Sequence, residues 1–152
     1  MKRVQFDYAL RPTVIQSDRE RLNVGKLDNR GLRRIAKGKI FLTIDKPREF
    51  VVIDSEVLDY LVQLKGVVDQ IDTGNHETFA VSGDYFSNNL KFAFDQSSKQ
   101  LTIQEANGGD FTITIQYKDF RSSLLAFYKQ TLADFLILYP ELNENEAYHA
   151  MT

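Results

Sequence analysis

The sequence contains no cysteine and no tryptophan, and it has only two histidines among 152 residues. Without cysteine the chain has no disulfide, no thiolate nucleophile, no iron–sulfur cluster and no zinc site with a sulfur ligand. The histidines, His76 and His149, are far apart in the sequence and belong to no metal-binding spacing such as HExxH. We therefore predict no metal site. The lack of cysteine is compatible with a reducing cytosol.

Long apolar runs are also missing. No stretch approaches the roughly 18 apolar residues of a membrane span, and the first residues, Met1 to Asp7, lead into no apolar run typical of a signal peptide. We therefore expect a cytoplasmic protein that does not enter a membrane.

Motifs of catalysis and of cofactor binding are missing as well. The pair Gly108-Gly109 lies between two predicted strands, so it lacks the helix N-terminus that holds phosphate. No nucleophile elbow of the GxSxG kind is present. We predict no cofactor and no catalytic residue, and we expect a protein that is not an enzyme. An enzyme that uses paired carboxylates stays open, because the 21 Asp and Glu residues could face each other only in the fold.

What the chain does contain is typical of a globular domain: 43% hydrophobic and 26% charged residues. Its length fits one domain. We place an α+β domain at residues 1–140 and an acidic, frayed tail at 141–152. The 11 phenylalanines and 7 tyrosines predict an aromatic core, or an apolar cavity that holds a ligand.

Alternating apolar and polar residues predict the strands. They lie at about 2–10, 39–45, 50–53, 77–82, 90–95, 101–104 and 111–117, and Asn107-Gly108-Gly109 has the composition of a hairpin turn. Apolar residues at three- and four-residue spacing predict a helix over about 57–71 and a longer one over about 120–139, which Pro140 ends. Because tight turns join consecutive strands, we predict an α+β fold. Its antiparallel sheet has about six to seven strands, and the internal helix and the long C-terminal helix pack on one face.

Residues 16–38 hold three glycines and only scattered apolar residues, and they are interpreted as a long loop with a short strand near 22–27. Residues 11–39 carry nine basic side chains against three acidic ones, while the whole chain has a net charge of −2. Such a segment attracts an acidic partner, or it neutralises the acidic surface of its own domain. For the first case we predict that Arg30, Arg33, Arg34 and Lys37 bind the partner. Nucleic acid is not expected, because the segment has no aromatic residue on which bases could stack.

The order of elements resembles that of small uncharacterised bacterial proteins, several of which are thought to be immunity partners of secreted toxins. The resemblance covers residues 38–139 and rests on the following segments: Gly38-Lys39-Ile40-Phe41-Leu42-Thr43-Ile44-Asp45, Phe50-Val51-Val52-Ile53, Leu58 and Leu61, Leu90-Lys91-Phe92, Leu101-Thr102-Ile103, Phe127 and Phe135. It is a resemblance of plan, and it carries over no functional residue. It implies a non-enzymatic, cytosolic protein-binding domain of the immunity type. The alternative is a carrier of a small hydrophobic ligand, bound between the sheet and the C-terminal helix.

Overall fold

The computed structural model describes residues 4–45, 48–83, 89–106 and 111–152. Its elements, in chain order, are β1 (Val4–Leu10), α1 (Pro12–Arg21), η1 (Val24–Lys26), α2 (Asn29–Leu32), β2 (Lys37–Asp45), β3 (Arg48–Glu56), α3 (Val57–Asp72), β4 (Phe79–Val81), β5 (Leu90–Asp95), β6 (Gln100–Glu105), β7 (Thr112–Gln116), α4 (Tyr117–Leu138), η3 (Pro140–Glu144) and α5 (Glu146–His149). The α+β class and the antiparallel pairing are confirmed. The Asn107-Gly108-Gly109 turn lies outside the described residues.

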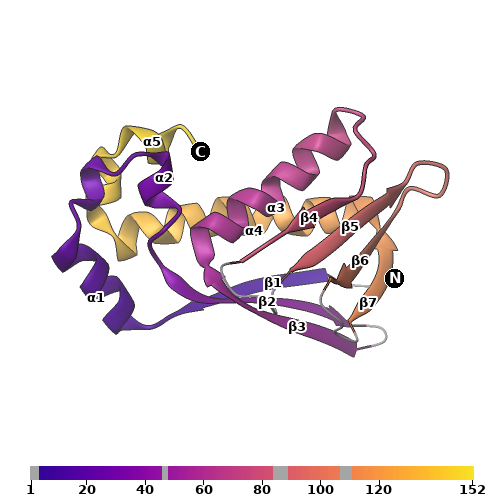
Figure 1. Cartoon of the computed structure of the whole chain (residues 1–152), viewed down its shortest axis with the longest axis horizontal. Helices are drawn as coiled ribbons and strands as arrows, with labels where there is room; N and C mark the ends of the chain where they lie inside the picture. The colour runs from indigo at the N-terminus through magenta and orange to yellow at the C-terminus, as the bar shows by residue number, and fades with distance from the viewer. Residues whose placement is uncertain (1–3, 46–47, 84–88, 107–110) are drawn as a thin grey trace.

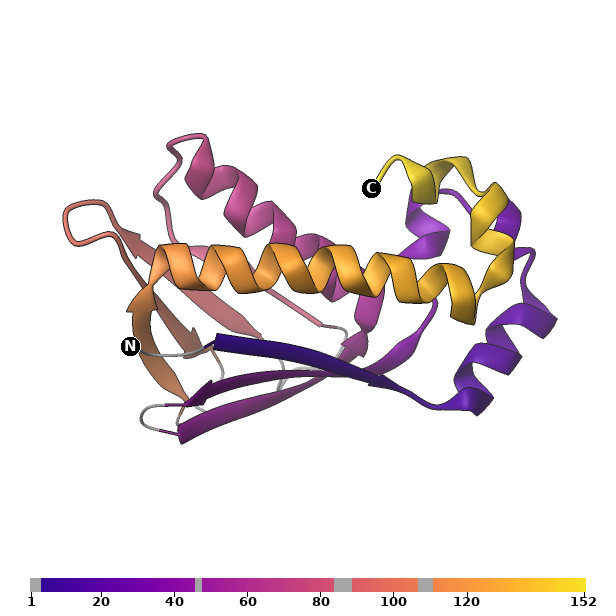
Figure 2. The ribbon, with the colours of Figure 1, turned by 180° about the vertical axis from the view of Figure 1, so that it is seen from behind.

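The seven strands of the described chain are divided between two sheets, in the orders β1-β2-β3 and β4-β5-β6-β7. In Figure 1, α3 and α4 lie above the β1-β2-β3 sheet, and α4 passes behind the β4-β5-β6-β7 sheet. In the reverse view, α4 runs lengthwise above β1 (Figure 2). The division follows from α3, which is inserted between β3 and β4 in the chain and packs against both.

The core lies between the two helices and the sheets. On α3 the buried positions recur every three or four residues, including Leu61, Leu64 and Val68, as expected of a helix with one apolar face. On α4 the Phe120 ring touches rings of both sheets: Phe6 of β1 at 5.8 Å and Phe92 of β5 at 5.6 Å between centroids. This ring, fully buried, joins the two sheets.

The prediction of a long loop at residues 16–38 is wrong. This stretch holds most of α1, then η1 and α2, and the short strand expected near 22–27 is instead the 3-10 helix η1. Helix α1 begins at Pro12, because proline is favoured in a first helical turn, where its missing N–H has no partner to lose. The helix was missed because its only buried residue is polar, Asp18, so no apolar stripe marks it.

The frayed tail predicted at 141–152 is also wrong. Residues in this stretch form η3 and α5, and Leu142, Asn145 and Tyr148 are buried. The Asn145 amide donates to the carbonyl oxygens of Val24 and Leu27 at 2.8 and 2.9 Å, and its oxygen accepts from the Tyr148 N–H at 2.8 Å. The C-terminal residues are therefore bonded to the segment around η1.

Candidate functional site: a basic cleft

The basic residues at positions 30–37, up to the first residue of β2, reach the surface because their apolar neighbours are anchored in the core. Leu32, Ile35 and Ala36 are completely buried. Arg30, Arg34 and Lys37 are exposed and Arg33 is partly buried. The short helix α2 fixes this alternation at its start, since the Asp28 carboxylate caps it by accepting from the Gly31 N–H at 2.7 Å.

All four residues predicted to bind a partner line one cleft of about 560 Å³. The other lining residues are Asn29, Glu56 and Asp59. Asp59 comes from the first turn of α3, and Glu56 is the last residue of β3. These two acids were not predicted, because nothing in the sequence indicates that the start of α3 packs beside α2.

The acids of the cleft neutralise part of its positive charge. Arg33 Nε lies 2.6 Å from Asp59 Oδ1, and Lys37 Nζ lies 4.0 Å from the carboxylate of buried Glu56. Arg30 and Arg34 form no ion pair with any residue that the structure describes. Two guanidinium groups are thus left available to an acidic ligand.

The basic segment also neutralises the domain's own acids, as the alternative interpretation expects. Arg19 Nε bonds Glu141 at 2.9 Å, and Lys39 forms an ion pair with Asp54 of β3. The neutralising interpretation therefore holds for part of the segment, and partner binding by the other residues stays a prediction. Arg19 and Lys39 are paired within the domain, while Arg30 and Arg34 have no ion pair in the part of the chain that the structure describes.

A smaller cleft of about 230 Å³ adjoins the first. Arg34 and Lys37 line both clefts, so these side chains stand between them. Arg21 of α1 adds a further exposed cation to the smaller cleft. The basic surface therefore continues from α2 onto α1.

A buried junction holds these elements together. Asp18 Oδ2 accepts from the Ala36 N–H at 2.9 Å and from the Tyr139 hydroxyl at 2.7 Å. Ala36 has a φ of 64°, a left-handed conformation in which its N–H points to Asp18 while its C=O accepts from the Val57 N–H. Burial, together with the Asp18 carboxylate, raises the pKa of Tyr139. The junction sets where the chain leaves α2 and enters β2.

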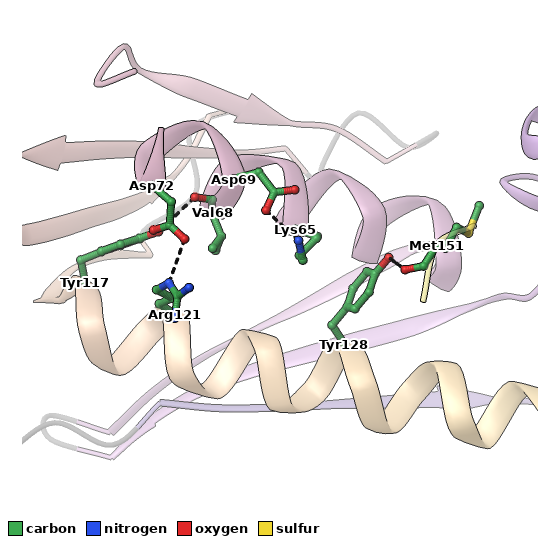
Figure 3. Close-up of polar contacts among 8 residues, drawn as sticks. All are labelled: Lys65, Val68, Asp69, Asp72, Tyr117, Arg121, Tyr128 and Met151. Atoms are coloured by element: carbon green, nitrogen blue, oxygen red, sulfur yellow. Dashed lines mark hydrogen bonds and ion pairs between the residues drawn. The ribbon is translucent and has the colours of Figure 1, made fainter. Parts of the chain in front are cut away.

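A second polar cluster lies between α3 and α4 (Figure 3). The Tyr117 hydroxyl donates to Asp72 Oδ1 at 2.8 Å and contacts the Val68 carbonyl oxygen at 3.2 Å, while Arg121 Nε donates to Asp72 Oδ2 at 2.9 Å. Burial and the Asp72 carboxylate raise the pKa of Tyr117. Because both carboxylate oxygens of Asp72 accept from α4, we interpret this cluster as a clasp between the helices.

Farther along the same seam, Lys65 Nζ donates to Asp69 at 2.6 Å and lies 5.8 Å from the centre of the Tyr128 ring. The Tyr128 hydroxyl donates to the Met151 carbonyl oxygen at 2.7 Å (Figure 3). The chain's last residues are thus tied to α4, which again contradicts a frayed tail.

Among the described residues, no three His, Asp or Glu side chains come together as they would around a metal ion. No helix within the described ranges is long and apolar enough to cross a membrane. Comparison of the chain with protein-family models, with curated proteins and with solved structures finds no match. The interpretation of the cleft therefore rests on its own geometry and charge.

Proposed function

We propose that the chain is a non-enzymatic protein-binding domain that takes an acidic segment of its partner into the basic cleft. The observation that carries the proposal is the pair Arg30 and Arg34: both are exposed, both line the cleft, and neither is used in an ion pair within the described chain. A guanidinium group presents a planar set of donors that matches a carboxylate, so two such groups favour a segment with two or more Asp or Glu residues.

The lining of the cleft favours a protein over a nucleic acid. None of its seven lining residues is aromatic, so it offers no surface on which a base could stack. Glu56 and Asp59 repel any anion in the cleft, so an acidic segment would be placed beside Arg30 and Arg34. The Arg33–Asp59 and Lys37–Glu56 pairs hold the walls in place and leave the outer cations for the partner.

Within this class we propose a bacterial, cytoplasmic inhibitor of the immunity type, which covers the active site of a toxin. The plan of the chain supports this form of the function, and the absence of cysteine fits a reducing compartment. The basic cleft fits a toxin that presents an acidic surface. An enzyme that acts on nucleic acid has a basic site and would be engaged through an acidic surface instead, so it is not the target that we expect.

The experiment starts with a partner identified by affinity capture and mass spectrometry, and measures its binding to the purified chain by calorimetry. Replacing both arginines, Arg30→Glu with Arg34→Glu, should weaken binding about 30-fold, or about 2 kcal/mol, because two charge-assisted contacts become repulsive. The loss should shrink as salt is raised from 50 to 500 mM.

The matched control makes the same change in charge elsewhere, with Lys91→Glu and Lys129→Glu, two exposed residues outside the cleft. It should alter the affinity less than threefold. A partner that binds both double variants equally well would contradict the assignment of the cleft. A purified chain that binds no protein partner at any salt concentration would contradict the proposed function as a whole.

A further inference from the structure

A third cleft, of about 750 Å³, lies between β1 and α4 and shares no lining residue with the basic cleft. It is lined by Val4 to Tyr8 of β1, by Phe41 and Thr43 of β2, and by Ser123, Ala126, Phe127, Gln130, Thr131 and Asp134 of α4. Among the strands that the structure describes, only β2 pairs with β1, so β1 is an edge strand. Figure 2 shows α4 above the length of β1. The cleft therefore follows the free edge of a sheet.

The backbone of β1 fixes which of its groups face that edge. In a strand the N–H and C=O of one residue point to the same side, and the side alternates from residue to residue. The Ala9 carbonyl oxygen points at Gly38 of β2, where an added Cβ would meet it at 2.3 Å. The odd-numbered residues therefore bond to β2, and Val4, Phe6 and Tyr8 direct their backbone groups outward.

Two of these outward groups already have partners within the chain. The Val4 carbonyl oxygen accepts from the Ser123 hydroxyl at 2.8 Å. The Tyr8 N–H donates to Asp7 Oδ1 at 2.8 Å. Among the described residues none bonds across this edge to the N–H or C=O of Phe6, which lies between them. Phe6 thus presents the donor and acceptor that one residue of an added antiparallel strand would use.

The side chains of the cleft indicate what such a strand carries. The rings of Phe6 and Phe127 stack with their centres 5.5 Å apart. The charged lining residues are Asp7 and Asp134, and the lining contains no Lys or Arg. Asp134 accepts from the Tyr8 hydroxyl at 2.9 Å and from Gln130 at 2.8 Å, both uncharged donors. Neither acid has an ion pair among the described residues, so the cleft is negatively charged around an aromatic centre.

One further polar atom in the cleft lacks a partner. Thr131 is completely buried, it belongs to the lining of the cleft, and its Oγ1 forms no hydrogen bond within the described chain. A buried hydroxyl without a partner lowers stability. An occupant of the cleft that brings a donor or an acceptor to Thr131 would remove this penalty.

We propose that an extended, basic segment of a partner protein adds to β1 as a fourth strand of the β1-β2-β3 sheet. The partner residue opposite Phe6 exchanges two backbone hydrogen bonds with it and lies on the same face, against Phe127. The residues on either side point to the opposite face, where Asp7 lies. The expected pattern is an apolar residue flanked on both sides by Lys or Arg, bound by strand addition.

The test uses a synthetic heptapeptide that alternates Lys and Val, beginning and ending with Lys, and measures its binding to the full chain by calorimetry. The exchange rate of the Phe6 amide proton is followed by NMR. Binding should slow that exchange at least tenfold, because the N–H becomes part of a ladder. The same peptide with Glu in place of Lys should bind at least tenfold more weakly.

Two N-methylated peptides separate strand addition from charge attraction. Methyl groups on the valine amides remove the donors that face β1 and should weaken binding at least tenfold, whereas methyl groups on the lysine amides face away and should spare it. On the protein side, Asp7→Asn with Asp134→Asn should lower affinity roughly tenfold, while Glu77→Gln with Glu144→Gln, an equal charge change at exposed sites outside the cleft, should not.

Three outcomes would overturn the proposal. Equal binding of the two methylated peptides would show attraction by charge alone. A free chain that dimerises with its Phe6 amide already protected would show that a second copy takes the edge. Binding of an uncharged apolar dye in the cleft, with no binding of the Lys/Val peptide, would instead favour a carrier of small hydrophobic ligands. Circular dichroism of each variant confirms that the fold is retained.

Discussion

Replacement of Asp18 by alanine tests whether the segment before β2 is held by one buried carboxylate. Oδ2 of Asp18 accepts from the Ala36 N–H and the Tyr139 hydroxyl, and both donors belong to residues with no exposed surface. Each charge-assisted hydrogen bond contributes about 1.5–3 kcal/mol, and each donor left buried without an acceptor adds to the cost. We therefore expect Asp18→Ala to lower the free energy of unfolding by about 4 kcal/mol.

Urea denaturation followed by circular dichroism measures this loss, which for a chain of this length corresponds to a fall in Tm of roughly 10 °C. Tyr139→Phe should cost about 2 kcal/mol by itself. The double variant should lose about 1–2 kcal/mol less than the sum of the two single losses, because residue 139 then has no hydroxyl that could be left without a partner.

The control is Glu20→Ala, a charge removal on the same helix at an exposed residue whose carboxylate bonds only to Gln16 in the described chain. It should cost less than about 0.5 kcal/mol. If the free energy of unfolding of Asp18→Ala lies within about 1 kcal/mol of that of the unaltered chain, the junction does not hold the segment and our reasoning about Asp18 is refuted.

The remaining predictions concern three further buried features. Asn145→Ala should lower the free energy of unfolding by about 3 kcal/mol in urea melts, because three hydrogen bonds are lost; a change near zero would restore the frayed tail. Ala36→Gly should change the free energy of unfolding by less than about 1 kcal/mol, because relief of the left-handed strain at Ala36 offsets the greater entropy of glycine in the unfolded chain. Ala36→Val should lower the free energy of unfolding by more than about 2 kcal/mol. Equal free energies of unfolding for the two variants would contradict the strain. Burial raises the pKa of Tyr60, Tyr139 and Tyr148 above their usual value near 10. As pH rises, the unfolded chain therefore releases these protons first, so the free energy of unfolding is unaffected below pH 10 and falls above it, by about 4 kcal/mol for the three tyrosines at pH 11. Urea melts at each pH measure this loss, and absorbance at 295 nm follows tyrosine ionisation. A free energy of unfolding that stays constant from pH 9 to 11 would contradict the prediction.

The regular elements were predictable because their burial repeats along the sequence. Leu61, Leu64 and Val68 mark α3 through helical spacing, and the alternation of Ile113 and Ile115 with threonines marks β7. Helix α1 gave no such signal, because its buried residue is an aspartate and its apolar residues only partly reach the core. Polar contacts of Asp18 hold it in place, and the two partners of Asp18, Ala36 and Tyr139, lie 18 and 121 residues away.

The basic cleft was predictable in its cations and not in its acids. The cluster Arg30, Arg33, Arg34 and Lys37 is visible as a run of charge, and the structure places all four in one cleft. Which of them are neutralised depends on where α3 starts in space, because Asp59 lies 26 residues after Arg33. For this region the sequence left open only the alternative of a ligand cavity between the sheet and the C-terminal helix. It did not indicate a cleft along β1, because the order of strands within a sheet, and so the identity of its edge strand, is a tertiary property.

The amino-acid composition by itself excluded cysteine chemistry. Local sequence patterns determined the α+β class, the antiparallel pairing and the two long helices, because these depend on neighbours within a few residues. Tertiary structure decided the division of the strands into two sheets and the folding of the segment before β2 and of the last residues. It also decided which cations stay unpaired and which strand is left with a free edge. Each of these depends on contacts between residues far apart in the chain, where a hydrogen bond or an ion pair forms only once the core has brought both partners together.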